Sequence, residues 1–156
     1  MEQAIKDWQT SLPRYFLSSD IPEWFLGPRI VLFWKCANIH MLLLLASRRH
    51  QKDPHSRRRN SAKCQELAIR LITDICNFCE VYARLLHNDL SWYAVYYLLQ
   101  SVLAFGTHKI LDWQEEWHLE SPPQLGSEWE STIKNARRCL SNLGSRNGGL
   151  FALFMS

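Results

Sequence analysis

Apolar residues recur every three or four positions along most of the chain, and no stretch alternates between apolar and polar residues as a half-buried strand would. Prolines, glycines and polar runs separate these periodic stretches from one another. The pattern predicts an all-α fold, with an irregular aromatic-rich N-terminal strap followed by about four main helices. We place these helices at roughly 28–47, 61–87, 91–111 and 127–143.

Two of the predicted helices, 28–47 and 91–111, are apolar over most of their circumference. Helices of this kind usually lie in the interior of a domain. We therefore expect these two to lie side by side in the core. The helix at 61–87 has a single apolar stripe instead, formed by Leu67, Ala68, Leu71, Ile72, Ile75, Cys79, Tyr82 and Leu86.

Local breaking and capping signals set the expected helix ends. Pro13, Pro22 and Gly27 interrupt the N-terminal region, so we expect a short helix near 2–11 and then the strap. Pro28 suits the first turn of the next helix. The last helix should begin with a capping box formed by Ser127 and Glu130, and end before Gly144.

Positive charge is concentrated in one segment. Residues 48–60 carry a net charge of +5, whereas the whole chain carries +3, so the rest sums to −2. We interpret 48–60 as a basic interhelical loop. Its arginines could form a nuclear-localisation or nucleic-acid patch, and the alternative is a simply solvated loop. The residues concerned are Arg48, Arg49, Arg57, Arg58 and Arg59.

Targeting and membrane signals are weak. The N-terminus has early charges and no apolar segment of the kind found in signal peptides. The longest apolar stretch, Ile30–Ala46, contains Lys35, Asn38 and His40 and falls short of the roughly 20 apolar residues of a membrane span. The five cysteines have no spacing typical of a secreted disulfide scaffold. We expect a soluble protein of a reducing compartment with no membrane partner.

Cysteine and histidine patterns point to no specific chemistry. Cys76 and Cys79 form a CxxC motif, but the motif falls in the middle of an apolar helical stripe rather than after a strand, so we expect small buried core residues. Cys36, Cys64 and Cys139 stand alone, and a zinc site would need a second ligand pair. The six histidines are scattered. We predict no catalytic, cofactor-binding or metal-ligating residue, and no enzyme.

Two aromatic features leave alternatives open. The stretch 113–129 mixes tryptophans with acids, which is typical of an activation segment or, alternatively, of a surface loop before the last helix. Three aromatic pairs could line a small-molecule pocket or simply pack in the core. These pairs are Tyr15-Phe16, Trp24-Phe25 and Tyr96-Tyr97.

The order and spacing of these landmarks carry a resemblance over roughly residues 5–145. The chain resembles the C-terminal half of the middle homology region of fungal zinc-cluster (Zn₂Cys₆) transcription factors. Residues 29–45 look like the central helix of that region, and SWYAVYYLLQSVLAF (91–105) looks like its Trp/Tyr-rich helix. The other matching residues are Trp8, Leu12, Pro13, Tyr15 and Phe16, then Cys64, Ala68, Ile69 and Ile72, and finally Trp129, Ile133, Ala136 and Leu140.

The resemblance implies a nuclear role in regulating transcription by RNA polymerase II. The six-cysteine zinc cluster of the family is absent, so zinc is expected only on a missing N-terminal cluster, and this chain should not bind specific DNA alone. Residues 1–156 then form a single helical regulatory domain, which is either a fragment of a larger one or a shortened relative of the family. The central helix also lacks the usual closing Arg-Pro, because His50 follows Arg48-Arg49. The alternative function is a free-standing helical protein-interaction or small-molecule-binding module.

The predicted amount of apolar surface implies a partner. In a domain of only four helices, the helices at 28–47 and 91–111 should keep part of their apolar surface exposed. Trp24, Phe25, Trp113 and Trp117 add further apolar surface. We expect an exposed apolar face that binds the rest of the regulatory region or another subunit. Protein co-regulators or a small-molecule effector are further expected partners.

Overall fold

The computed structural model describes residues 2–116 and 126–146, without the side chains of residues 2, 49, 88, 112–116 and 146. The described residues form helices and connecting turns and contain no strand, which confirms the all-α prediction. The helices are α1 (Glu2–Ser11), α2 (Arg14–Leu17), α3 (Glu23–His50), α4 (Pro54–Val81), α5 (Asn88–Glu116) and α6 (Ser127–Arg146), with a short 3₁₀ turn, η1 (Ala83–Leu85), before α5.

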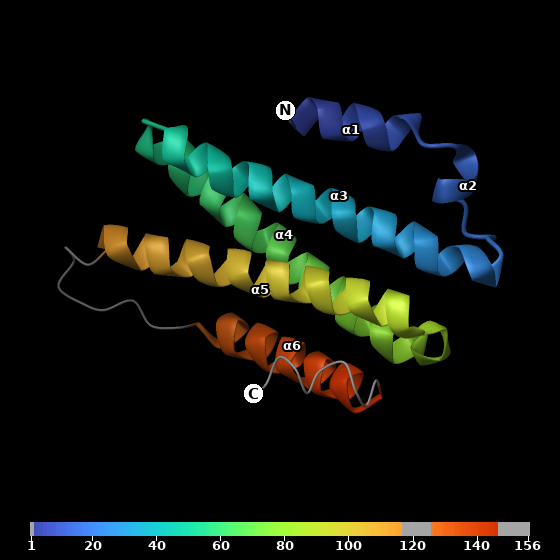
Figure 1. The fold of residues 1–156 in the computed structure, drawn as a ribbon. Helices are drawn as coiled ribbons and strands as arrows, with labels where there is room; N and C mark the ends of the chain where they lie inside the picture. The colour runs from blue at the N-terminus through green and yellow to red at the C-terminus, as the bar shows by residue number, and fades with distance from the viewer. Residues whose placement is uncertain (1, 117–125, 147–156) are drawn as a thin grey trace.

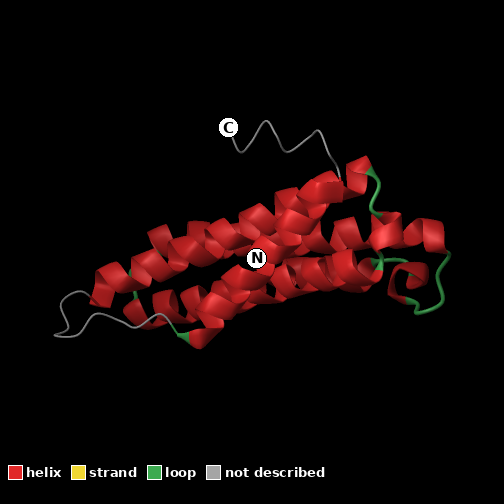
Figure 2. Cartoon of the chain, turned by 90° about the horizontal axis from the view of Figure 1, so that it is seen from below, coloured by secondary structure: helices red, strands yellow, loops and turns green. Residues whose placement is uncertain are grey.

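The long helices α3, α4, α5 and α6 form an elongated bundle (Figures 1 and 2). Helix α4 packs against α3, α5 and α6, while α1 lies along the outer side of α3 (Figure 1). Helices α3 and α5 do contact each other, as expected, but they are not the most enclosed helices of the bundle. That position belongs to α4, because its interfaces with the other three long helices are together more extensive than those of α5, which also contacts all three.

The predicted irregular strap is wrong, because most of this region is helical. The helix near 2–11 is present as α1, but α2 follows it and α3 already begins at Glu23. Pro28 therefore lies inside α3, where it cannot donate the intrahelical bond to residue 24. Two contacts lie near this early start. Glu23 pairs with Arg84 at 2.7 Å, and the Arg29 guanidinium donates to the Ser18 carbonyl oxygen at 2.8 Å.

The predicted basic loop at 48–60 is also wrong in its bounds. Helix α3 continues to His50, and α4 begins at Pro54, so only residues 51–53 connect them. Asp53 caps α4, because its carboxylate accepts from the backbone N–H groups of His55 at 3.3 Å and Ser56 at 2.9 Å. Proline in the first turn suits this start, since the missing N–H would have no helical partner there.

The remaining helix ends differ by several residues from the predicted ones. Helix α4 ends at Val81 rather than 87, and α5 begins at Asn88 rather than 91 and runs to Glu116. Helix α6 begins with Ser127 already helical and continues past Gly144 to Arg146. The loop expected after Glu116 and the tail after Arg146 lie outside the described residues, as does Trp117.

The core centres on Trp34 of α3. Its indole is 1% exposed and meets the Phe78 ring of α4 edge-on, with 5.5 Å between the ring centroids. Met41, Ile72, Ile75, Leu98 and Phe105 are also essentially inaccessible to solvent. Edge-to-face aromatic pairs add to the stabilisation that their buried area provides. The core therefore forms where the inward stripes of α3, α4 and α5 meet.

Helix α3 is, over Glu23–Arg48, long and apolar enough to cross a membrane, judged by length and composition alone. This differs from the prediction that the apolar stretch falls short of a span, because the helix starts earlier than expected. A buried core helix meets the same criterion, and Trp34, Asn38 and Met41 of α3 are buried in the bundle. Only 28% of its most apolar stretch is fully buried, however, and much of the rest of α3 is partly exposed.

Candidate functional site: an apolar groove and an exposed helical seam

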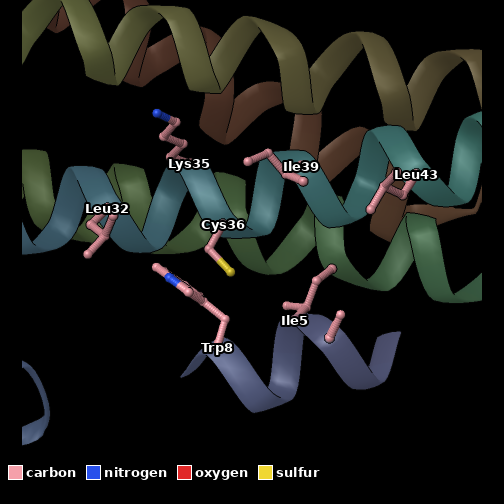
Figure 3. A pocket seen from close by; sticks show the side chains of 8 residues that line it. Ile5, Trp8, Leu32, Lys35, Cys36, Ile39 and Leu43 are labelled. Carbon is pink, nitrogen blue, oxygen red and sulfur yellow. The ribbon is translucent and has the colours of Figure 1, made fainter. Parts of the chain in front are cut away.

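A groove separates α1 from α3 (Figure 3). It has a volume of about 430 Å³, which falls within the range of small-molecule pockets. Trp8 and Ile5 point from α1 towards Cys36 and Leu43 of α3 (Figure 3). Ala4, Leu32, Lys35 and Ile39 complete the lining.

The groove offers burial of apolar groups and little polar chemistry. The Lys35 ammonium is the one formally charged group in its lining, and this side chain extends away from α1 in Figure 3. Cys36 lies in the floor, where the Gln9 amide donates to its sulfur at 3.6 Å. Burial raises the pKa of the Cys36 thiol, and the hydrogen bond from Gln9 opposes that rise only in part. Cys36 is therefore a neutral thiol at neutral pH and acts here as an apolar surface.

The outer side of α5 carries a second apolar feature, which we call the α5 seam. It consists of five side chains between 43% and 63% exposed: Trp92, Tyr96, Leu99, Leu103 and Ile110. Their spacing of four, three, four and seven residues is that of a helix that packs along a second helix. At the skipped position, Gly106, an added Cβ would lie 3.8 Å from the Trp129 ring of α6, so α6 borders the seam there.

The inner side of α5 carries a second row of residues, which begins two positions after the seam and has the same helical spacing. Ala94, Leu98, Ser101, Phe105 and His108 are at most 1% exposed. A shift of two residues rotates about 200° around a helix, so the buried row and the seam lie on nearly opposite sides of α5. The bundle covers one row and leaves the other in solvent, which explains why α5 is apolar nearly all round. Helix α3 likewise exposes Ile39 and Leu42.

The structure separates the five arginines of the expected basic patch. Arg48 is buried and donates to the Ser61 hydroxyl oxygen at 2.9 Å, so it cannot reach a nucleic acid on the surface. Arg57 is half-buried and donates to the Gln51 carbonyl oxygen at 3.3 Å. Arg58 and Arg59 are exposed on the first turns of α4, and the side chain of Arg49 is outside the described ones. The patch stays a prediction for Arg49, Arg58 and Arg59.

A buried polar network joins three helices at the end of the bundle where α3 meets α4. The Ser61 hydroxyl of α4 accepts from Arg48 of α3 and lies 3.0 Å from Nδ1 of His108 on α5. Gln65 also donates to the same hydroxyl, at 3.4 Å. Ser61 and His108 are at most 2% exposed, so a substrate in solvent does not reach this serine–histidine pair. The network therefore positions helices rather than performing hydrolytic chemistry.

Cys139 is not isolated, contrary to expectation. It lies on α6 against Cys76 and Cys79 of α4, and each of those thiols is placed to hydrogen-bond to it. These bonds lower the pKa of the Cys139 thiol, Arg138 lowers it further, and burial opposes the shift. The described residues contain no group of three or more His, Cys, Asp or Glu side chains arranged to hold a metal ion. Sixty residues separate Cys139 from Cys79, so spacing alone could not reveal the cluster.

The aromatic pairs pack mainly against each other. The Phe16 and Phe25 rings are 5.0 Å apart and Tyr15 lies 5.6 Å from Phe25, which ties α2 to the start of α3. Trp24 is 76% exposed beside them. In the stretch 113–129, Trp129 stacks on Phe105 of α5 at 4.7 Å, whereas the side chain of Trp113 and residues 117–125 lie outside the described part.

Fold and surface together define an all-α bundle with an apolar groove and an exposed apolar seam. Comparisons with protein-family models, with curated proteins and with solved structures found no match to this chain.

Proposed function

We propose that this chain is a helical regulatory module of a transcription factor, which acts in the nucleus on transcription by RNA polymerase II. The resemblance to the middle homology region of fungal zinc-cluster regulators supports the proposal. In this role the module does not read DNA itself. It binds a helix of the same regulator or of another subunit, and that contact controls the output of the factor.

The observation that carries the proposal is the α5 seam. Five large apolar side chains at helix-packing spacing remain between 43% and 63% exposed. Soluble proteins rarely leave contiguous apolar surface of this kind without a use for it. A heptad-like row fits a partner helix better than a small ligand, because knobs on one helix fill holes on another. The expected partner is therefore an amphipathic helix with its own apolar row.

The test tethers the 156-residue chain to an unrelated DNA-binding domain upstream of a reporter gene in yeast. Reporter mRNA should change severalfold, in either direction, relative to the DNA-binding domain alone. The double substitution Leu99→Glu with Leu103→Glu should abolish that change, because charges in the seam prevent helix packing. Both side chains are exposed, so the bundle itself should keep its stability.

A matched control places the same two charges on another helix. Thr73→Glu with Asn77→Glu changes two exposed positions of α4 and should leave the reporter response intact. If the wild-type chain leaves reporter mRNA unchanged, the transcriptional proposal is wrong. If the seam variant changes reporter mRNA as much as the wild-type chain does, the seam is not the surface that produces the response.

The α1–α3 groove supports a second candidate, a module that binds an apolar small molecule. Its lining is almost wholly apolar and its volume is about 430 Å³. Dodecanoate is a suitable probe, and isothermal titration should detect its binding to the wild-type chain. Cys36→Phe fills the groove and should weaken binding at least tenfold, whereas Ala46→Phe, on an exposed position of α3, should not. Equal binding by both variants would exclude the groove.

A further inference from the structure

The cysteine cluster between α4 and α6 opens to solvent through a small cavity. This cavity has a volume of about 50 Å³ and is lined by both Cys79 and Cys139. Glu80, Leu86, Asn142 and Leu143 form the rest of its wall. A cavity of this size holds a few water-sized molecules, since one water needs roughly 10–15 Å³. Hydrogen peroxide fits it, whereas a tripeptide thiol such as glutathione does not.

Three thiols meet at the bottom of this opening. Cys79 is 8% exposed and Cys139 is 6% exposed, while Cys76 lies deeper at 2%. Cys76 and Cys79 are one helical turn apart on α4, and both lie within hydrogen-bonding reach of the Cys139 sulfur. A hydrogen-bond donor beside a sulfur favours the thiolate, because the donor stabilises the negative charge. Cys76 has a single S–H and donates it to the Asn135 carbonyl oxygen, one turn before Cys139, at 3.8 Å, so Cys79 is the thiol left to donate to Cys139.

An ion pair with no net charge borders the cluster. Arg138 precedes Cys139 and forms an ion pair with Glu80 of α4 at 2.8 Å. Thiolates that react with oxidants are accessible and lie near basic groups and hydrogen-bond donors. Cys64, which is fully buried on α4, serves as the unreactive reference thiol. Burial alone raises the pKa of the Cys64 thiol to about 12. The two environments predict opposite reactivity for two buried cysteines.

We propose that Cys139 is a peroxide-reactive thiol and that Cys79 is the partner with which it closes a disulfide between α6 and α4. The Cys139 thiolate attacks one peroxide oxygen, the O–O bond breaks, and hydroxide leaves as Cys139 becomes a sulfenic acid. The Cys79 thiol then attacks the sulfenic sulfur, the S–O bond breaks, and water leaves as the disulfide forms. Two thiols are oxidised and one peroxide is reduced to two waters.

Oxidation has a structural consequence. Helix α6 has its larger interface with α4, and the Arg138–Glu80 ion pair that spans this interface is exposed. Exposed ion pairs contribute little to stability. A disulfide between Cys79 and Cys139 therefore adds a covalent link where the reduced protein relies on packing. The proposal does not depend on the transcriptional role, because it concerns only the chemistry of these three side chains.

The first experiment uses the wild-type chain alone. The folded protein is exposed to hydrogen peroxide, the remaining thiols are alkylated, and all five cysteines are followed by peptide mass spectrometry. Cys139 should react at least about tenfold faster than Cys64, and a Cys79–Cys139 disulfide peptide should accumulate. Equal rates for Cys139 and Cys64 would overturn the proposal. Glutathione disulfide should modify neither residue, and rapid glutathionylation of Cys139 would show that helix opening, not the cavity, controls access.

Two variants then separate the roles. In Cys79→Ser, sulfenic acid should persist on Cys139 and be trapped by dimedone, because its partner thiol is missing. A Cys76–Cys139 disulfide in that variant, formed as fast as the wild-type disulfide, would overturn the assignment of Cys79. In Cys139→Ser, Cys79 should become as unreactive as Cys64. Circular dichroism melts establish that each variant is folded, and the wild-type comparison tests the proposal even where a variant is not.

Discussion

The Nη1 atom of Arg48 donates a hydrogen bond of 2.9 Å to the Ser61 hydroxyl, and both residues are buried at the α3–α4 contact. His108 Nδ1 lies 3.0 Å from the same hydroxyl and brings α5 into the network. A buried guanidinium needs acceptors, because removal from water is costly unless the charge is hydrogen-bonded. The relationship therefore fixes how three helices meet at one end of the bundle.

The substitution Ser61→Ala should destabilise the fold by about 2 to 4 kcal/mol, since it removes bonds to Arg48, His108 and Gln65 together. Urea denaturation followed by circular dichroism measures the effect. Ser131→Ala is the control, because the exposed Ser131 bonds only locally to the Glu128 carbonyl oxygen, and its effect should stay within about 0.5 kcal/mol. Equal stability of Ser61→Ala and the wild type would rule out a stabilising role for the network.

Asn38 is expected to limit the stability of α3. It is 5% exposed, and its Oδ1 atom has no hydrogen-bond partner among the described residues. Such a group loses its bonds to water without replacement. Asn38→Leu should therefore raise the free energy of unfolding by about 1 kcal/mol. The same change at the exposed Asn77 serves as a control, and a destabilised Asn38→Leu protein would indicate that Oδ1 is satisfied in solution.

The cap of α4 makes stability depend on pH. Hydrogen bonds from Ser56, with a further one from His55, lower the pKa of the Asp53 carboxyl below its usual 3.8. Because the folded pKa is the lower one, the carboxylate stabilises the fold above the unfolded pKa, and this stabilisation is lost as pH falls through the folded pKa. Asp53→Ala should lower the melting temperature by a few degrees at pH 7 and have little effect at pH 2.

Thermal melts of both proteins at the two pH values test this prediction. Asp20→Ala supplies the control, since α3 has no side-chain cap and the change should matter at neither pH. If Asp53→Ala lowers the melting temperature equally at both pH values, the destabilisation comes from backbone conformation rather than from the carboxylate.

The bare chain should self-associate through the α5 seam. Its exposed side chains can pair along a second copy when no other partner is present. Sedimentation velocity should show a sedimentation coefficient that rises with concentration, together with strong binding of a hydrophobic dye. Leu99→Glu with Leu103→Glu should restore a monomer. A monodisperse wild-type monomer without dye binding would instead indicate a complete core and favour the free-standing module.

Sequence alone was sufficient for the all-α class and for the approximate place of each long helix. Helical periodicity is local, so residues such as Leu71, Ile72 and Ile75 carry it without reference to the rest of the fold. Helix ends were less predictable. Asp53-Pro54 is a local start signal that the interpretation of 48–60 as a loop overlooked. Helix α3, in contrast, begins at Glu23, where Phe25 packs on Phe16 of α2, a tertiary contact that periodicity does not show.

The candidate sites also contain features that the sequence predicts and features that only the tertiary structure shows. Periodicity revealed that the helices containing Trp34 and Leu98 are apolar on several sides, but only the bundle decided that Leu99 and Leu103 face solvent while Leu98 is enclosed. Only the tertiary structure brought Cys139 to Cys79 and took Arg48 away from the surface. The physical reason is that periodicity records which side of a helix is apolar, whereas packing between distant segments determines which of those sides is covered.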